Sequence, residues 1–282
     1  MRLYELYGKP LATKAIQNGI PQEKLATISH LITVSCTGMY APGLGIDLIK
    51  AFDLPRTIKR SAINFMGCYA TFPALRLANS ICTADPDAKV LIVGVELCTL
   101  HLQKEYNEDN LFASAIFSDG AGALLVESQL TAASNLKLNH FYSNIIPDED
   151  NNMAWYIRDL GFDMKLSAYI PHLLNTGIRP LLNGLFESLR IKKSEIDYYA
   201  IHPGGKKILE SIEDCLEIES KKNQQAHEVL RACGNMSSVT ITFVLQKILQ
   251  NMQQQESINN ILTMAFGPGL TLEAALLETC YV

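Results

Sequence analysis

Three polar side chains in this sequence have the chemistry of a nucleophile and its activators. Cys68, His202 and Asn235 each lie in a short turn that follows a predicted strand or begins a predicted helix. Sites in open α/β sheets form beyond the carboxyl ends of strands, so residues far apart in sequence can meet there. A Cys–His pair generates a thiolate that attacks acyl groups, and an Asn N–H beside a His N–H can hold an oxyanion. The three residues together therefore predict acyl transfer.

The segment around Cys68 reads as strand, tight turn and buried helix. Ser61–Phe65 is extended, a glycine follows, and apolar residues at helical spacing continue from Ala70 to Ile81. At a helix start, unpaired N–H groups and the helix dipole favour an anion, so we expect the Cys68 thiol to ionise easily. The alternatives are that Cys68 fills the core, that His202 is structural and that Asn235 caps a helix.

Composition excludes several classes of protein. The chain has 282 residues and 48% hydrophobic content, enough for a large core in one or two domains. The net charge of −5 does not suggest a nucleic-acid surface or a basic membrane patch. Seven cysteines without a C-x-x-C pair indicate reduced thiols in the cytoplasm, not disulfides or a metal site. We find no signal peptide and no apolar run of the ~18 residues that span a bilayer, so we expect no integral membrane segment.

Strands and helices alternate along the chain, which indicates a layered α/β sheet. Strands are predicted at 30–35, 61–65, 89–95, 123–127, 196–201, 261–266 and 271–278. Helices are predicted at 1–18, 44–52, 111–116, 170–189, 206–216 and 234–251. We expect a turn at 118–122 and a polar crossing between two halves within 131–152. The strand–turn–helix layout occurs twice, which predicts a first half at 1–130 with the nucleophile and a second half at 131–282 with the His and the Asn.

Six segments of the sequence resemble the chalcone and stilbene synthase family, the type III polyketide synthases of the thiolase fold. They are INFMGCYATFPALRLA, CTGMYAPG, FSDGAGALLVE, IHPGGKKILE, GNMSSVT and AFGPGLTLEAALL. Their order and spacing match the family from about Tyr4 to Leu277. Ketoacyl synthases of this fold also use Cys, His and Asn, but GNMSS and FGPGLT favour the polyketide synthases. The resemblance implies a thiolase-like layered αβαβα fold with two related halves.

The resemblance also implies a mechanism. Cys68 would take an acyl group from an acyl-CoA starter, while His202 and Asn235 would stabilise the enolate that malonyl-CoA forms on losing CO2. Repeated Claisen condensations and a cyclisation would follow. The substrates are CoA thioesters, no permanently bound cofactor or metal is implied, and the family forms homodimers. The alternatives are a single-condensation ketoacyl or hydroxymethylglutaryl synthase, and an inactive truncated remnant.

The same resemblance assigns residues around the triad. Phe117 is implied as a gate to the cavity, although an ordinary core aromatic is an equal alternative. The CoA tunnel positions are Leu166, Gly204 and Lys207, of which Lys207 is otherwise a solvated surface charge. The substrate-cavity positions are Thr37, Cys98, His101, Ala113, Trp155, Met164 and Ser237.

Two cavity positions depart from the family pattern. Trp155 stands where a glycine is usual, so we expect its indole to narrow or redirect the cavity. Met164 replaces a second gating phenylalanine. At the position from which a partner subunit of the family inserts a methionine, this chain has Ala41. We therefore expect a product other than chalcone.

The resemblance begins inside the family's N-terminal half. The family has further strands and helices before the position that matches Met1, so we expect this half to be incomplete here. Either the sequence is a fragment or its start lies at an internal methionine. Strands that lose such neighbours expose their edges, which places the activity of the shortened chain in question.

Overall fold

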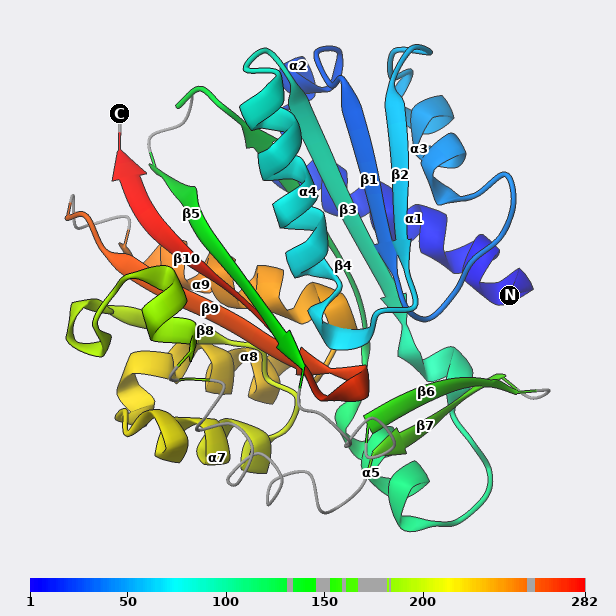
Figure 1. The fold of residues 1–282 in the computed structure, drawn as a ribbon. Helices are drawn as coiled ribbons and strands as arrows, with labels where there is room; N and C mark the ends of the chain where they lie inside the picture. The colour runs from blue at the N-terminus through cyan, green and yellow to red at the C-terminus, as the bar shows by residue number, and fades with distance from the viewer. Residues whose placement is uncertain are drawn as a thin grey trace.

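The computed structural model places α-helices in layers around two β-sheets (Figure 1). It describes residues 1–130, 134–145, 153–158, 161–166, 182, 184–252 and 257–281, without the side chains of residues 134 and 164–166. Most of the helix predicted at 170–189 lies outside these residues. In the described part, no helix is both long and apolar enough to cross a bilayer.

The predicted elements of the first half occur in the predicted order, although the bounds of several differ by a few residues. The helices are α1 (Arg2–Gly19), α2 (Gln22–Leu25), α3 (Leu44–Phe52), α4 (Thr71–Ala84) and α5 (Glu108–Ile116). The strands are β1 (His30–Ser35), β2 (Lys59–Asn64), β3 (Lys89–Leu97) and β4 (Asp119–Glu127). Two 3-10 helices, η1 (Gly67–Tyr69) and η2 (Cys98–His101), follow β2 and β3.

The second half has its own strands and helices. The strands are β5 (Ser134–Ile145), β6 (Met153–Arg158), β7 (Gly161–Leu166), β8 (Tyr198–Ile201), β9 (Asn260–Gly267) and β10 (Thr271–Tyr281). The helices are α7 (Lys206–Leu216), α8 (Gln224–Cys233) and α9 (Thr240–Met252). The 3-10 helices are η3 (Lys193–Glu195), η4 (Ser220–Asn223), η5 (Ser237–Val239) and η6 (Pro268–Leu270).

The two large sheets share a pairing pattern. The first has the order β2-β1-β3-β4, in which β1 is parallel to β2 and β3, and β4 is antiparallel to β3. The second has the order β5-β10-β9-β8, in which β8 is parallel to β9 and the other pairs are antiparallel. The steps β1-β3-β4 and β8-β9-β10 are therefore equivalent, which confirms a layered α/β fold with two related halves. The boundary at residues 130 and 131 stays a prediction.

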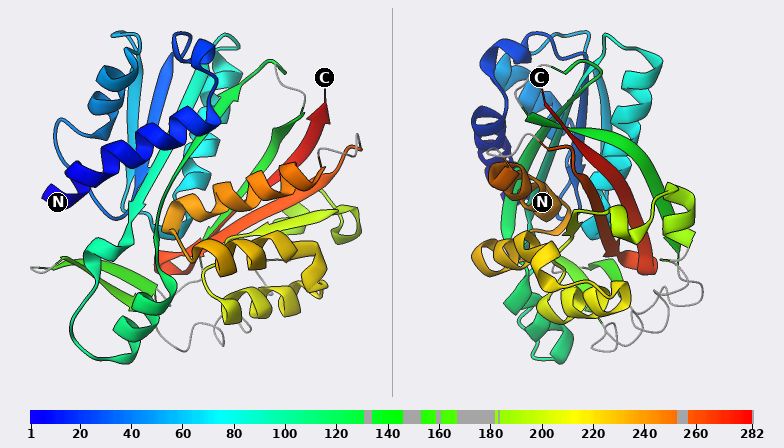
Figure 2. Two further views of the ribbon diagram at one scale, coloured as in Figure 1. Left: turned by 180° about the vertical axis from the view of Figure 1, so that it is seen from behind. Right: turned by 90° about the vertical axis from the view of Figure 1, so that its left-hand side faces the viewer.

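Helices cover both faces of each sheet. The helix α4 contacts β3 and β10, and α9 contacts β4 and β8, so these two helices form the layer between the sheets (Figures 1 and 2). Outside the first sheet, α1 buries Tyr4, Gly8, Ala12 and Ile16, whose spacing of four residues places them on one helical face. The helices α7 and α8 cover the second sheet and share its apolar core.

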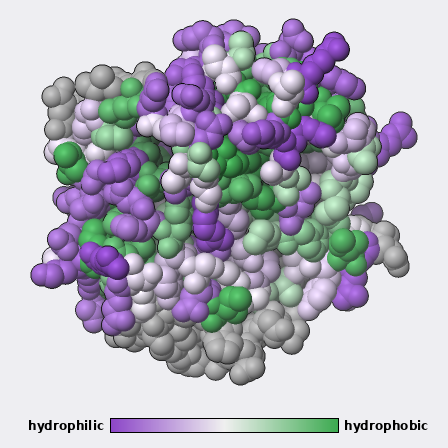
Figure 3. All heavy atoms as spheres, turned by 45° about the horizontal axis from the view of Figure 1, so that its top comes forward, coloured by the Kyte–Doolittle hydropathy of each residue, from purple (hydrophilic) through white to green (hydrophobic). Residues whose placement is uncertain are grey.

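Apolar residues also reach the surface of the molecule (Figure 3). Figure 3 shows apolar side chains gathered near the centre of the upper face, with polar residues around them. The apolar side chains of β4 are half-buried, whereas those of β10 between residues 271 and 277 are buried. In the described residues, β10 has a neighbouring strand on both edges and β4 has one, which explains the difference in burial.

One sequence prediction about the first half of the fold is wrong. The segment 118–122 is not a turn, because β4 begins at Asp119 and pairs with β3 from Leu97 onwards. Its glycines are required by packing: a Cβ at Gly122 would lie 2.5 Å from the Thr242 hydroxyl of α9. Glycine therefore marks a close approach of helix and strand here.

The polar segment 131–152 contains a strand that was not predicted. Ser134–Ile145 is strand β5, which pairs along its length with β10. Among the described strands it lies at the edge of its sheet, and one side of it is half-exposed, so its sequence lacks the continuous apolar run of a central strand. The hairpin β6–β7 was not predicted either, because its residues follow no clear alternation.

An ion pair joins the middle layer to the second sheet. Arg76 on α4 donates two hydrogen bonds to Glu273 on β10, at 2.8 and 3.3 Å, and the Ser143 hydroxyl of β5 donates a third at 2.8 Å. The Glu273 side chain is 3% exposed and Arg76 is 41% exposed. A bidentate pair of this kind is stronger than a surface pair because one partner is withdrawn from water.

We expect Arg76→Met to lower the free energy of unfolding by about 2 kcal/mol, because it leaves a buried carboxylate without its cation. Urea denaturation measures this effect. The exposed pair between Lys193 and Glu217, 3.4 Å apart, provides the control: Lys193→Met should change stability by less than about 0.5 kcal/mol. Equal effects of the two substitutions would contradict the importance of this buried pair.

Candidate active site

Cys68 lies where the two halves touch. Gly67, just before it, has a φ of +74°, and a Cβ at Gly67 would lie 2.2 Å from Pro268 of the second half. A Cβ at Gly267 would in turn lie 2.5 Å from the Tyr69 ring. Only glycine fits at both positions, so the turn after β2 and the turn after β9 can pack directly against each other. This contact brings Cys68 to the second half.

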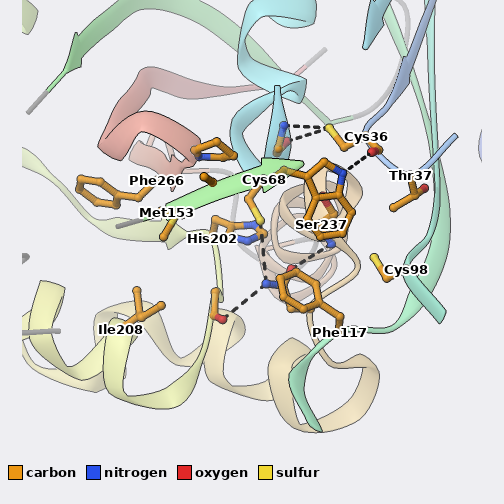
Figure 4. Close-up of a pocket in the computed structure, with 16 residues that line it drawn as sticks. Cys36, Thr37, Cys68, Cys98, Phe117, Met153, His202, Ile208, Ser237 and Phe266 are labelled. Carbon is orange, nitrogen blue, oxygen red and sulfur yellow. Dashed lines mark hydrogen bonds between the residues drawn. The ribbon is translucent and has the colours of Figure 1, made fainter. Parts of the chain in front are cut away.

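His202 follows β8 and is buried, with 3% of its surface exposed. Its backbone N–H donates to the Met264 carbonyl at 2.8 Å, which extends the pairing of β8 with β9 and fixes the start of the side chain. Neither ring nitrogen has a hydrogen-bond partner among the described residues. In Figure 4 the ring of His202 and the sulfur of Cys68 project into the same part of one pocket.

Asn235 is held in place by its own backbone. Its N–H donates to Ile116 O and its carbonyl accepts from Ser118 N, both at 2.9 Å, so the residue pairs with the segment that carries Phe117. The side-chain Oδ1 accepts the Ser237 N–H at 2.9 Å. Because that contact needs an acceptor, the Nδ2 group must be the one that faces Cys68.

The Nδ2 group of Asn235 makes two contacts toward the pocket. It lies 3.9 Å from Cys68 Sγ and 3.4 Å from the Gly204 carbonyl (Figure 4). An amide N–H that points at a sulfur atom can also donate a hydrogen bond to an oxygen atom that lies close to that sulfur. The structure thus brings Asn235 within donor range of the predicted nucleophile.

These side chains line a pocket with about 730 Å³ of space not occupied by atoms, its open mouth included. Most of its walls are apolar, and a few thiol, hydroxyl and amide groups are placed among them. The lining residues are Cys36, Thr37, Gly67, Cys68, Cys98, Phe117, Met153, Ala154, Trp155, His202, Gly204, Ile208, Asn235, Ser237, Phe266 and Pro268.

The prediction of an easily ionised thiol is contradicted. Cys68 lies in η1 and not at the start of α4, which begins at Thr71. Burial raises the pKa of the Cys68 thiol to about 12, although hydrogen bonds from Asn235 and Ser237 act in the opposite direction. The loss of hydration outweighs these donors, so the thiol is the favoured form.

Burial has the opposite effect on the pKa of His202. It lowers the pKa of the imidazole to about 3, while Asn235 has a smaller opposing effect. The structure thus favours a neutral thiol beside a neutral imidazole over a thiolate–imidazolium pair. A neutral imidazole can accept a proton from a thiol, and the resulting N–H can then be donated to an oxyanion. The arrangement is suited to nucleophilic acyl transfer.

The predicted cavity residues divide into three groups. Phe117, Thr37, Cys98, Trp155 and Ser237 line the pocket with the triad, as does Gly204. His101, Ala113 and Lys207 are not among the lining residues: Lys207 is exposed, and Ala113 is half-buried on α5. The side chains of Met164 and Leu166 lie outside the described residues.

Trp155 forms the edge of a small aromatic cluster that closes one side of the pocket. Its indole Nε1 donates to the Cys36 carbonyl at 3.0 Å. The ring meets His101 and Phe162 edge-on, at centroid distances of 5.8 and 5.9 Å, and these two rings stack on each other at 4.2 Å. The cluster fixes the position of the indole at the pocket wall.

His101 ties this cluster to the first half. Its Nε2 lies 2.6 Å from the Thr37 carbonyl, so this nitrogen carries the proton, and its Nδ1 accepts the Phe162 N–H at 3.0 Å. Both ring nitrogens are thus used within the protein, and burial lowers the pKa of the imidazole. His101 therefore supports the wall from behind.

Sequence reasoning missed one buried acid and several apolar lining residues. Glu96 lies at the end of β3, is fully buried, and accepts hydrogen bonds from Cys36, Thr37 and Ser238. A single acid within the apolar run KVLIVGVEL is a signal that could have identified it. The apolar residues Met153, Ile208 and Phe266 carry no such signal, since their types are those of any core.

Comparison with known families gives two matches that together span nearly the whole chain. Residues 4–129 match the family described as "Chalcone and stilbene synthases, N-terminal domain". Residues 137–280 match "Chalcone and stilbene synthases, C-terminal domain".

Individual proteins agree with these matches. The chain is 30% identical over 285 residues to the "Alpha-pyrone synthesis polyketide synthase-like Pks18" of Mycobacterium tuberculosis, covering 99% of this chain and 72% of that protein. The crystal structure of PKS-I from the brown alga Ectocarpus siliculosus superposes with a TM-score of 0.87 at 27% identity, over 97% of this chain and 74% of that one. The C-terminal type III polyketide synthase domain of Steely1 from Dictyostelium gives 0.89 at 28% identity, over 98% and 78%.

Two paired sheets with a helical layer between them, and a Cys, a His and an Asn around one pocket, define a thiolase-like fold of the kind found in type III polyketide synthases. The chain belongs to the chalcone and stilbene synthase family.

The buried His202 predicts a specific dependence of stability on pH. Its pKa is lowered in the folded state, so below about pH 6.5 the unfolded chain binds a proton that the folded protein does not bind until about pH 3. Stability therefore falls as the pH decreases through this range, with a slope from this group of up to about 1.4 kcal/mol per pH unit.

Urea denaturation of the wild type and of His202→Gln between pH 7 and pH 4 measures this slope. The substitution removes the titrating group, so the stability difference between the two proteins should shift in favour of the variant as the pH falls. Parallel curves for the two proteins would show that His202 is not buried in the neutral form.

Proposed function

We propose that the chain is an acyltransferase that condenses malonyl-CoA repeatedly onto an acyl-CoA starter, with Cys68, His202 and Asn235 as catalytic residues. The observation that carries the proposal is the pairing of two features in one pocket. The Asn235 amide donates toward the Cys68 sulfur at 3.9 Å, and the buried His202 ring has both nitrogens free of partners within the described residues. Buried polar atoms of this kind are retained where a substrate will use them.

The first step loads the starter. His202 accepts the proton of the Cys68 thiol as the sulfur attacks the thioester carbonyl of the acyl-CoA. The carbon–sulfur bond to CoA breaks, and the CoA thiolate takes a proton from His202. The lowered pKa of His202 keeps the imidazole neutral and therefore able to act as the base.

The second step forms the carbon–carbon bond. Malonyl-CoA loses CO2, and the N–H groups of Asn235 and His202 hold the enolate oxygen that results. The enolate carbon attacks the acyl group on Cys68, whose bond to sulfur breaks, so that a β-ketoacyl-CoA forms. The Cys68 thiolate that leaves takes a proton from the solvent. The lengthened thioester can reload onto Cys68, and a cyclisation ends the sequence.

CoA thioesters serve as substrates, and the mechanism uses no resident cofactor or metal. We propose that CoA approaches along the side of the pocket formed by Gly204, with the gate Phe117 beside it. Lys207 is an exposed cation at the start of α7, where it can meet a CoA phosphate. Leu166 is proposed for the same tunnel on the family resemblance alone.

We further propose a cytoplasmic homodimer that associates along β2. This edge strand pairs only with β1 in the described residues, and most of its side chains are exposed. An unpaired edge of this kind favours association with a second copy. Sedimentation of the purified chain tests the dimer, and a monomer at all concentrations would rule it out.

Two alternative functions would give different results in assays. A single-condensation ketoacyl or hydroxymethylglutaryl synthase would stop after one C–C bond, so product length separates it from the proposal. An inactive remnant would fail to take an acyl group from acyl-CoA onto Cys68. Mass spectrometry of the intact protein after incubation with acyl-CoA detects that transfer directly. Alkylation of Cys68 would not separate the two cases, because the raised pKa of Cys68 slows alkylation in an active enzyme too.

We expect Cys68→Ala to abolish acyl loading and product formation. Asn235→Ala should retain loading and lower condensation by about 10²- to 10³-fold, because one donor to the enolate is lost. Incubation with labelled malonyl-CoA and fatty or aromatic acyl-CoAs, with chromatography of pyrones and resorcinols, measures both. Product formation by Cys68→Ala at the wild-type rate would contradict the mechanism.

Trp155 should limit the length of the product. Trp155→Gly removes the indole from the pocket wall, so we expect products with one or more additional malonyl-derived units in the same assay. Trp155→Phe is the matched control, because it retains an aromatic wall and loses only the hydrogen bond to the Cys36 carbonyl. Identical product lengths from the glycine substitution and the wild type would show that another surface sets the limit.

A further inference from the structure

Strand β8 ends one residue before His202 and has a neighbouring strand on one edge only, among the strands that the structure describes. The His202 N–H donates to the Met264 carbonyl of β9, and successive residues of a strand direct their backbone groups to opposite edges. The N–H of Ile201 therefore points away from β9. Ile201 is 0% exposed, so this buried N–H requires an acceptor from another part of the protein.

The acceptor is the side chain of Asn223, at the end of η4. Its Oδ1 accepts the Ile201 N–H at 3.2 Å, and Asn223 is itself 0% exposed. Just before the strand begins, Lys222 Nζ donates to the Ile196 carbonyl at 2.8 Å. The 3-10 helix η4 thus takes the place of a neighbouring strand along this edge of β8. Asn223 is not among the residues that line the pocket, so any effect on His202 passes through the backbone.

Glu213 on α7 holds the Asn223 amide in this orientation. Its Oε1 accepts from Asn223 Nδ2 at 2.8 Å, so the other amide atom, Oδ1, must be the one that faces Ile201. The Oε2 atom accepts the Ser220 hydroxyl at 2.7 Å, and His227 Nε2 of α8 lies 2.7 Å from Oε1. Glu213 is 3% exposed. One buried carboxyl group therefore joins α7, η4 and α8 behind the end of β8.

We propose that Asn223 is a positioning residue for His202, and that Glu213 fixes the orientation of its amide. The inference rests on the proposed role of His202 as a base and hydrogen-bond donor. The ring nitrogens of His202 have no hydrogen-bond partner among the described residues, so the backbone has to place the imidazole beside Cys68. Met264 anchors that backbone on one side, and Asn223 anchors the preceding residue on the other.

NMR of the 282-residue protein with 13C-labelled histidine reads the surroundings of the ring directly. The chain has six histidines, and the signal of His202 is the one that His202→Gln removes. Asn223→Asp keeps the shape of the side chain but places an acceptor where Glu213 needs a donor, so the His202 signal should shift or broaden. Thr279→Val is the matched control and should leave it unchanged, because the buried Thr279 hydroxyl accepts the Asn259 N–H at 2.8 Å outside the pocket.

Mass spectrometry of the intact protein measures how fast Cys68 takes an acyl group from acyl-CoA in the same variants. Asn223→Asp should slow this loading by about tenfold, because a displaced imidazole accepts the thiol proton less well. Thr279→Val should stay within about twofold of the wild type, since it lies apart from the pocket. Loading by Asn223→Asp at the wild-type rate would overturn the proposal.

The double variant Asn223→Asp/Glu213→Gln separates orientation from a general loss of stability. It again pairs a donor with an acceptor, in the reverse sense, and the His227 ring can pair with either group by changing tautomer. The His202 signal and most of the loading rate should therefore return, and no recovery of either would refute the role of the pair.

Asn223→Ala serves if Asn223→Asp does not fold, because it leaves the Ile201 N–H unpaired without bringing two acceptors together. The same shift of the His202 signal and the same slowing of loading are expected. An unshifted signal in both Asn223 variants would overturn the proposal. A wild-type protein that takes no acyl group from acyl-CoA would count against the proposed function alone, because the ring signal does not depend on turnover.

Discussion

The limited access of water to Cys68, which is half-buried, and to His202, which is buried, is the constraint on which the rest of the site depends. Burial shifts the pKa of the thiol up and that of the imidazole down, so each group is held in its neutral form. A pair of neutral groups can lie in an apolar pocket at little electrostatic cost, whereas a separated ion pair would need further partners. The proton can then move from the Cys68 thiol to the His202 imidazole as the sulfur attacks a thioester, when negative charge develops on the carbonyl oxygen of that thioester. The Asn235 amide is already oriented for that charge by its bond to the Ser237 N–H.

The pocket exists because two separate halves meet with little between them. Gly67 and Gly267 allow the turns after β2 and β9 to approach to a distance that any side chain would prevent. The Arg76–Glu273 pair adds a second connection between α4 and β10. Both contacts join residues about 200 positions apart, and both lie next to elements that carry site residues. The packing of the two halves therefore also determines the geometry of the site.

The chemistry of the pocket changes across Cys68. In Figure 4, Phe266, Met153 and Ile208 lie to one side of the sulfur, while Cys36, Thr37 and Cys98 lie to the other. The first side is apolar, and the second carries thiols and a hydroxyl group. Trp155 closes the second side and is held by its hydrogen bond to a backbone carbonyl, so its ring is a fixed wall. Shape and polarity are thus set by residues from both halves.

The sequence by itself determined the elements that local patterns encode. The apolar run of β3 and the six family segments were sufficient to predict the layered fold and the meeting of Cys68, His202 and Asn235 in one pocket. Glycine patterns were less informative, because a turn and a close approach of two backbones use the same residue. The segment 118–122 is therefore strand where a turn was predicted.

Tertiary structure alone decided the ionisation state of the site and the composition of its walls. The pKa of Cys68 depends on how much water the second half excludes, and no local pattern reports that; the helix-start argument therefore predicted a shift of the wrong sign. Likewise, His101 has the residue type of a lining group but lies behind Trp155, where both of its nitrogens are bonded. Which side chains reach a pocket depends on contacts between distant segments, and these become defined only when the chain is folded.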